Sequence, residues 1–195
     1  MSIAGKKKKY TVEEYLQREE TAVEKSEYYR GEVYAMSGGT ENHSLISANV
    51  SGEMRGLLKG KDCRVYDSNF KVRIEAEDAF VYPDAMVVCG ATELHSESNH
   101  VCLNPTVVFE VLSESTADYD RGGKFRKYQQ IPSLQEYVIV HQKEAQVIVH
   151  RKTDTGWSTF EGRRYSDLNA SVELKSLEVE IPMSEIYYQV DFSEV

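Results

Sequence analysis

The chain has 195 residues, of which 32 are acidic and 23 basic, so its formal net charge is −9 with neutral histidines. Hydrophobic residues make up 41% and charged residues 28%, as in ordinary globular proteins, which excludes fibrous, low-complexity and disordered classes. A chain of this length can bury a core without disulfides or a structural metal. Because no repeat or linker divides it, we expect one domain over residues 1–195, with a mobile basic tail at 1–9.

Membrane association and secretion are not expected. The sequence has no apolar segment long enough to span a bilayer, and none follows its lysine-rich start as in a signal peptide. The three cysteines, Cys63, Cys89 and Cys102, lack the spacing of a metal site or of a disulfide framework. We interpret them as reduced thiols of a cytoplasmic protein.

The first sixty residues predict two helices and a hairpin. Thr11 and Glu14 form a capping box that opens a short helix over 12–19. Residues 28–36 alternate about a Gly-Glu turn, which predicts a small hairpin. Apolar residues then recur at spacings of three and four over 41–58, which predicts the first long helix.

Strands are expected next. Residues 63–75 alternate with a rough period of two and predict one strand or a bent pair. The segments 80–89 and 106–112 are short and almost continuously apolar. Each is therefore predicted to be one strand, covered on both faces, at the centre of the sheet.

A second helix and a β-rich end complete the pattern. Ser115 or Thr116 is placed to cap the helix, which carries Phe125 and Tyr128 and ends before Pro132. This order predicts an α/β (α+β) fold, a layered sheet with helices packed against it and a β-rich C-terminal extension. The later strands are expected at 136–140, 146–151, 156–161 and 172–174.

Two of the expected strands each carry one acidic residue that packing does not require. Asp84 follows a proline in the first strand, and Glu110 stands in the middle of the second. A carboxylate in an apolar strand is costly unless it is paired or bound to a metal. Two of them on neighbouring strands would form an oxygen site suited to Mg²⁺ or Mn²⁺. Alternatively, either acid is solvated at a strand end or pairs with Arg73, Arg121 or Lys124.

The second helix places a lysine near these acids. Asp120, Lys124 and Tyr128 are spaced by four and share one helix face, from which Lys124 could reach the sheet. Alternatively, Asp120 and Lys124 form an ordinary surface pair worth about 0.3–0.5 kcal/mol. Gly122 and Gly123 weaken a first helical turn by about 1 kcal/mol each relative to alanine, which favours close approach of another backbone or a ligand.

An ordered set of short motifs runs almost end to end along the chain: YYRGEVYAMSGG at 28–39, NHS at 42–44, YPD at 82–84, NPTVVFEVLSEST at 104–116, YDRGGK at 119–124, and 132–138. The set resembles the Uma-two endonucleases, a group within the PD-(D/E)xK restriction-endonuclease-like superfamily. The resemblance implies a restriction-endonuclease-like mixed central sheet flanked by helices.

The resemblance also implies a divalent-metal-dependent endonuclease that hydrolyses nucleic-acid phosphodiester bonds, with DNA favoured over RNA. Asp84 and Glu110 would be catalytic residues and would bind Mg²⁺ or Mn²⁺, together with the backbone carbonyl of Val111. The metal would polarise the phosphate and orient or deprotonate a water molecule. A lysine would stabilise the developing charge.

The lysine is not at its usual place. Two residues after Glu110 the chain has Leu112, so Lys124 is predicted to supply the catalytic amine from the helix, with Lys127 as the substitute.

Five residues are further candidates for lining the cleft. Glu32 and His43 fall in motif segments, and each would act as a general base, a substrate contact or a group that orients a metal ligand. For a helix histidine, a packing or surface role is the commoner one. The five candidates are Glu32, His43, Asp120, Lys127 and Tyr128.

Electrostatics is the weakness of the nuclease hypothesis, because nucleic-acid binders usually carry a basic footprint. A local basic patch could still face a duplex, since net charge does not fix its distribution. The alternatives are a non-catalytic nuclease-fold module that binds protein or nucleic acid, and a hydrolase of a small phosphodiester. The patch would contain Lys59, Lys61, Arg64, Lys71, Arg73, Arg121, Lys124, Arg126 and Lys127.

Two further expectations concern partners. The sequence lacks the glycine-rich loops of nucleotide-binding proteins, so no nucleotide cofactor is expected. The apolar-rich segment 177–188 is predicted to pair two copies of the chain in a homodimer.

Overall fold

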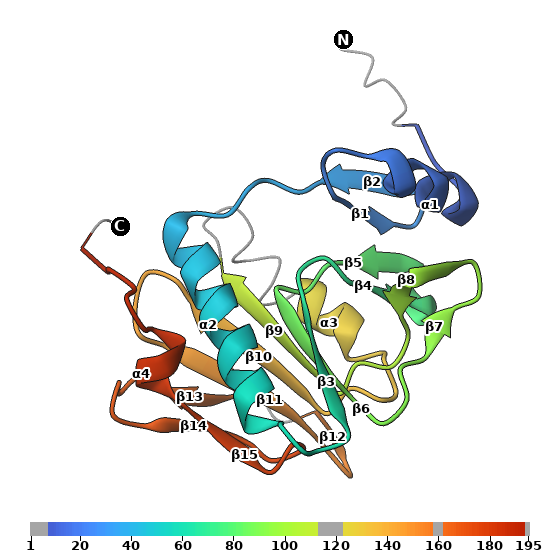
Figure 1. Cartoon of the computed structure of the whole chain (residues 1–195). Helices are drawn as coiled ribbons and strands as arrows, with labels where there is room; N and C mark the ends of the chain where they lie inside the picture. Colours follow the sequence, from blue (N-terminus) through green and yellow to red (C-terminus); the bar gives the residue numbers. More distant parts are fainter. Residues whose placement is uncertain (1–7, 113–122, 158–161, 194–195) are drawn as a thin grey trace.

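The centre of the molecule is a seven-stranded mixed sheet (Figure 1). The computed structural model describes residues 8–112, 123–157 and 162–193. In this sheet the order is β12-β11-β10-β9-β6-β3, with β13 paired to β11; β9 and β10 are parallel and the other neighbours antiparallel. The predicted mixed central sheet is therefore confirmed. Its strands are β3 (Cys63–Asp67), β6 (Ala85–Cys89), β9 (Val107–Leu112), β10 (Glu136–His141), β11 (Val147–Thr153), β12 (Gly156–Trp157) and β13 (Arg163–Tyr165).

Two smaller sheets accompany it. A six-stranded sheet has the order β2-β1-β5-β4-β8-β7, and β14 pairs with β15 in a separate hairpin. The hairpin expected over 28–36 is formed by β1 and β2, with Arg30 and Gly31 in its turn at positive φ. The strands are β1 (Ser26–Tyr29), β2 (Glu32–Ala35), β4 (Lys71–Ile74), β5 (Ala79–Val81), β7 (Leu94–His95), β8 (Ser98–Cys102), β14 (Ser171–Leu174) and β15 (Val179–Pro182).

In the described ranges, four α-helices and one 3₁₀ turn accompany these sheets. Both N-terminal helices start where a threonine side chain caps the first turn: Thr11 forms the predicted capping box, and Thr40 accepts the His43 N–H. No helix in the described ranges is both long and apolar enough to cross a membrane. The helices are α1 (Val12–Thr21), α2 (Glu41–Leu57), α3 (Phe125–Tyr128) and α4 (Met183–Ile186), with η1 at Glu75–Glu77.

The central sheet separates two apolar layers, and alternate residues of β9 and β10 point to opposite faces. On one face α2 packs with Phe109, Val111 and Val138, and the β14–β15 hairpin and α4 extend this layer. On the other face α3 and the six-stranded sheet pack with Val108 and Leu112. Glu110 lies between these last two positions and so shares the face that α3 covers.

The single strand predicted over 80–89 is wrong. The chain forms β5 in the small sheet, breaks at Tyr82-Pro83-Asp84, and continues as β6 in the central sheet. Proline has no N–H to donate to a strand ladder, so pairing stops there and the chain crosses between sheets. This crossing places Asp84 at the entrance of β6.

Other predicted elements differ in detail. The segment 63–75 is two strands, and they belong to different sheets rather than to one bent pair. The proposed caps of the second helix, Ser115 and Thr116, lie outside the described residues, and so does 158–161 of the late strand. Strands β7, β8, β13 and β15 and the short α4 were not predicted.

The apolar C-terminal segment is part of the core. Leu177, Ile181, Met183 and Ile186 are each at most 3% exposed and pack against α2 and the central sheet. These four side chains are therefore covered by their own chain and are not available for pairing, although Tyr188 is 57% exposed; the homodimer stays a prediction.

The basic tail and the basic patch also differ from expectation. Residues 1–7 lie outside the described part, but Lys8 stacks on the Tyr10 ring and Lys9 packs beside Gly31, so the last two tail residues contact the fold. Four members of the predicted patch are largely buried: Lys71, Arg73, Lys124 and Lys127. Among the described members of the predicted patch, these four are therefore not available to face a duplex.

Cysteine chemistry is a further correction. Cys63 and Cys89 are register partners on β3 and β6 and form a disulfide, so the prediction of reduced thiols is wrong for both. Their spacing of 26 residues follows no motif, and only strand pairing brings them together. Cys102 is a free buried thiol, and burial raises its pKa to about 11. The cytoplasmic location stays a prediction, which Cys63 and Cys89 no longer support.

Reduction of the disulfide tests its contribution. Because the bridge closes a loop of 26 residues, reduction is expected to lower the free energy of unfolding by about 3.5 kcal/mol in urea titrations. The control is Cys63→Ser/Cys89→Ser, whose stability should match the reduced protein and should not respond to reductant. Equal stability of oxidised and reduced protein would contradict the prediction.

A buried acid that the sequence did not single out fixes the C-terminal hairpin. Glu136 is fully buried, and its carboxylate accepts hydrogen bonds from Arg151 Nε at 2.8 Å and from the backbone N–H groups of Lys175 and Ser176 at 3.2 and 3.0 Å. Through these hydrogen bonds, Glu136 on β10 and Arg151 on β11 are tied to the turn before β15.

Glu136→Ala is expected to cost about 3–5 kcal/mol of folding free energy, because it leaves Arg151 and two N–H groups without their shared acceptor. Equilibrium denaturation measures this loss. Glu24→Ala, at an exposed acid, is the control and should change stability by no more than about 0.5 kcal/mol.

Candidate active site

The chain crossing places Asp84 against the centre of β9. The Asp84 N–H donates to the Phe109 carbonyl at 3.1 Å, and Asp84 Oδ2 accepts the Val111 N–H at 2.7 Å. The Ala85–Phe109 register, continued by one residue, sets Asp84 opposite Glu110. Two acids far apart in sequence are thus cross-strand neighbours.

Lys124, the N-cap residue of α3, reaches the same place. Its Nζ lies 2.9 Å from Glu110 Oε2 and also donates to the Tyr82 carbonyl at 3.2 Å. The side chains of Glu110 and Lys124 are only 3% and 6% exposed. Since Leu112 and Glu110 share the face that α3 covers, a lysine from this helix can approach Glu110 although position 112 is apolar. The alternative that Glu110 forms an ion pair with Lys124 is therefore what the structure shows.

A second acid, missed in the sequence, shares the lysine. Glu27 on β1 lies with Oε1 3.0 Å from Lys124 Nζ and accepts the Tyr82 N–H at 3.2 Å. Its side chain is 14% exposed. No spacing rule relates residue 27 to residue 124, and residue 27 precedes the predicted hairpin, whose acid Glu32 is a cleft-lining candidate instead.

His43 meets the other acid. Its Nε2 lies 3.3 Å from Asp84 Oδ1, at the N-terminal turn of α2. The backbone at Gly39 fits closely against this imidazole: a Cβ there would lie 2.7 Å from His43 Nδ1 and 3.0 Å from Cγ. A side chain at position 39 would therefore force the imidazole of His43 to shift.

The other four predicted cleft-lining residues do not all lie at this site. Lys127 is buried with its Nζ 3.5 Å from the centre of the Tyr29 ring, and burial lowers its pKa. Tyr128 is fully buried behind the Glu110–Lys124 pair. Glu32 accepts a hydrogen bond from the Tyr34 hydroxyl on β2, and Asp120 lies outside the described residues.

Val111 and Arg73 make contacts other than the predicted ones. Val111 contributes its N–H to Asp84, and a role for its carbonyl stays a prediction. Arg73 pairs with Asp78 at 3.0 Å rather than with either site acid.

The donor set fits a hard divalent ion that keeps most of its water. Asp84 and Glu110 offer carboxylate oxygens, and Mg²⁺ is commonly held by one or two carboxylates with waters completing its shell. Among residues 8–112, 123–157 and 162–193, no three acidic, histidine or cysteine side chains are grouped closely enough to hold a metal. The arrangement suits an open, two-carboxylate site rather than a closed cage of protein ligands.

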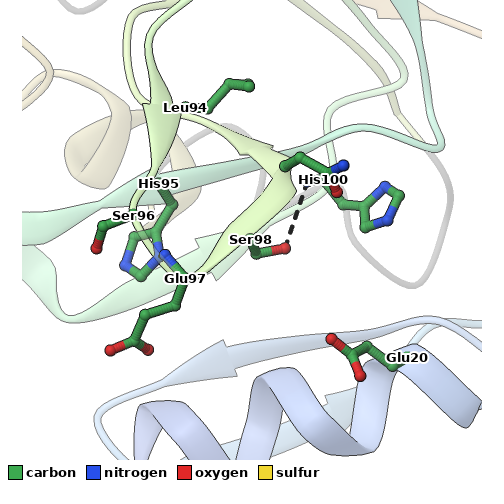
Figure 2. Close-up of a pocket in the computed structure, with 8 residues that line it drawn as sticks. Glu20, Leu94, His95, Ser96, Glu97, Ser98 and His100 are labelled. Atoms are coloured by element: carbon green, nitrogen blue, oxygen red, sulfur yellow. Dashed lines mark hydrogen bonds between the residues drawn. The ribbon is translucent and has the colours of Figure 1, made fainter.

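A separate hollow of about 390 Å³ lies between α1 and the β7–β8 hairpin (Figure 2). In this view the imidazoles of His95 and His100 do not converge, and Ser98 accepts the His100 N–H at 3.3 Å. Its lining residues include none of the acids or lysines that meet at Glu110. The hollow therefore lies apart from the acid–lysine cluster.

The mixed sheet and its buried acid–lysine group define a restriction-endonuclease-like protein, and comparisons with known proteins agree. A crystal structure of "a putative nuclease belonging to DUF820" from Anabaena variabilis ATCC 29413 has a TM-score of 0.71 at 16% identity, covering 91% of this chain and 97% of that chain. The Uma2 family model, described as "Putative restriction endonuclease", matches residues 12–184. The chain belongs to the Uma2 family.

Two relatives come from Synechocystis sp. (strain ATCC 27184 / PCC 6803 / Kazusa). Protein slr1290 is 38% identical over 184 residues, which cover 94% of each chain. Protein sll1609 is 34% identical over 142 residues, which cover 73% of this chain and 80% of the relative.

Gly39→Ala is expected to separate His43 from Asp84, because the new methyl group occupies the space of the imidazole. The nitrogen chemical shifts of His43 in long-range ¹H–¹⁵N spectra report this contact directly. Gly38→Ala is the matched control, since a Cβ there meets no atom within 4 Å. Identical His43 spectra in the two variants would count against the close fit.

Proposed function

We propose that this protein is a divalent-metal-dependent endonuclease that hydrolyses phosphodiester bonds of DNA. The observation that carries the proposal is the meeting of Asp84, Glu110 and Lys124, two carboxylates on neighbouring strands with a buried ammonium beside them. The family description and the neighbour's title name nucleases, which supports a nucleic-acid substrate.

Each side chain then has a distinct task. Asp84 and Glu110 would hold Mg²⁺ or Mn²⁺, which when bound polarises the phosphate and lowers the pKa of a coordinated water. Lys124 would stabilise negative charge that develops on the phosphate oxygens. Glu27, in contact with Lys124, keeps the ammonium directed at the site.

Asp84 is held from two sides. The Val111 N–H binds one carboxylate oxygen and His43 contacts the other, so the acid is fixed before any ligand arrives. His43 and Asp84 are 20% and 14% exposed, compared with 6% for Lys124. We infer that the phosphodiester approaches from the His43 side.

Cleavage assays test the proposal. Purified protein should nick supercoiled plasmid with Mg²⁺ or Mn²⁺ and not with excess chelator. Asp84→Asn, Glu110→Gln and Lys124→Met should each lower the rate by about 100-fold or more, because each removes a charge that acts on the reacting phosphate. Asp62→Asn, at an 82% exposed acid, is the control and should cleave like the parent protein.

A second measurement separates the competing functions. Circular dichroism confirms that each variant is folded, and calorimetric titration measures Mn²⁺ binding. A folded protein that binds Mn²⁺ and yet cuts neither plasmid, single-stranded DNA nor RNA would contradict the endonuclease and favour the non-catalytic binding module.

A further inference from the structure

A second buried acid–lysine pair, Glu19 and Lys71, is joined to the candidate active site through Tyr82. Glu19 lies near the end of α1, and its side chain is only 2% exposed. Lys71 Nζ is 3.8 Å from Glu19 Oε2, and the lysine side chain is 7% exposed. A buried ion pair rarely stabilises a fold more than well-packed apolar residues of the same volume. The pair is therefore a reason to ask what else the Glu19 carboxylate holds in place.

Each oxygen of the Glu19 carboxylate accepts a hydroxyl group from a different segment of the chain. Ser26 Oγ on β1 donates to Oε1 at 2.6 Å, and the Tyr82 hydroxyl, at the crossing between the two sheets, donates to Oε2 at 2.7 Å. Tyr15, one turn before Glu19 on the same face of α1, donates its hydroxyl to the Ser26 carbonyl at 2.7 Å. Helix α1 thus fixes the position of β1 relative to the crossing.

The two segments that Glu19 joins also supply two acceptors for the ammonium of Lys124. Glu27 follows Ser26 on β1, and its Oε1 lies 3.0 Å from Lys124 Nζ. The Tyr82 carbonyl accepts from the same ammonium at 3.2 Å, and the Tyr82 N–H donates to Glu27 Oε1 at 3.2 Å. Because a lysine side chain is long and flexible, the position of its ammonium depends on where its acceptors are held.

We propose that Glu19 is a positioning residue that acts on the reaction through Lys124. By binding one hydroxyl from β1 and one from the crossing, its carboxylate keeps Glu27 and the Tyr82 carbonyl at the separation that directs the ammonium toward the substrate phosphate. In this role Glu19 needs no contact with the substrate or the metal. This inference rests on the proposed function.

Spectroscopy tests the positioning in the protein without metal or substrate. Lysines labelled with ¹³C at Cε give separate ¹H–¹³C signals, and the signal that disappears in Lys124→Met is that of Lys124. Glu19→Ala removes both hydrogen bonds and should shift this signal. Glu136→Gln is the matched control, because Glu136 is a buried acid whose partners are Arg151 and the turn at 175–176. It should lower Tm and leave the Lys124 signal in place.

Kinetics tests the consequence for cleavage. Glu19→Ala should lower kcat for plasmid nicking by about 10- to 100-fold, because a small misplacement of a reacting group costs a rate factor of this order. In a Lys124→Met background the same change should alter kcat by less than about twofold, since the group through which Glu19 acts is absent. Glu136→Gln should leave kcat unchanged in both backgrounds. Rates are compared at saturating substrate and at a temperature where every variant is folded.

Two milder variants separate position from charge and from folding. In Glu19→Gln the amide can accept from one hydroxyl and donate to the other, so both contacts survive while Lys71 loses its carboxylate. Its Tm should fall and its kcat should stay within about twofold of the parent value. Tyr82→Phe removes one of the two contacts and should lower kcat even if Glu19→Ala does not fold.

An unshifted Lys124 signal in Glu19→Ala, an equal loss of kcat in both backgrounds, or a Glu19→Gln protein as slow as Glu19→Ala would overturn the inference. Failure of the parent protein to cleave any nucleic acid would instead overturn the proposed function, and the Lys124 signal would still decide whether Glu19 positions the ammonium.

Discussion

A carboxylate in the middle of an apolar strand is the constraint on which the rest of the site depends. Glu110 is 3% exposed, and an ionised group so placed is tolerated only with a charged partner and further hydrogen bonds. Lys124, the N-cap residue of α3, meets this need, while Phe125 and Tyr128 of the helix pack in the apolar layer on that face of β9. Lys124 in turn is an ammonium in an apolar layer, and Glu27 supplies its second carboxylate. The N-terminal hairpin is thereby part of the site.

The crossing between sheets makes this arrangement possible. Tyr82, just before Pro83, donates its N–H to Glu27, accepts from Lys124 at its carbonyl, and donates its hydroxyl to Glu19 on α1 at 2.7 Å. One residue therefore joins the first helix, the hairpin and α3. Because Pro83 ends the β5 ladder, the chain leaves the six-stranded sheet there. The next residue, Asp84, enters the central sheet opposite Glu110. The backbone break is what sets the spacing of the two acids.

Sequence reasoning found what local pattern or one exceptional residue reveals. The periodic helix over 41–58, the apolar strand 106–112, and the acids Asp84 and Glu110 all carry such signals. It missed what only tertiary pairing creates. The Cys63–Cys89 bridge and the contact of Glu27 with Lys124 join residues with no spacing rule, and the covering of the apolar C-terminal segment by α2 depends on topology. The burial of lysines such as Lys71 also depends on topology, and the sequence therefore predicted them to be surface charges.

The acidic charge of the chain is compatible with a polyanionic substrate when the site is considered by itself. Asp84, Glu27 and Glu110 with Lys124 carry three negative charges and one positive, a formal charge of −2 in a poorly solvated place. Such a cluster repels phosphate and attracts a divalent cation, whose charge would cancel it. Under the proposed function, a phosphodiester then meets a neutral cluster with an ammonium inside. Affinity for DNA would depend on the bound ion more than on a basic surface, as expected for a chain with a formal net charge of −9.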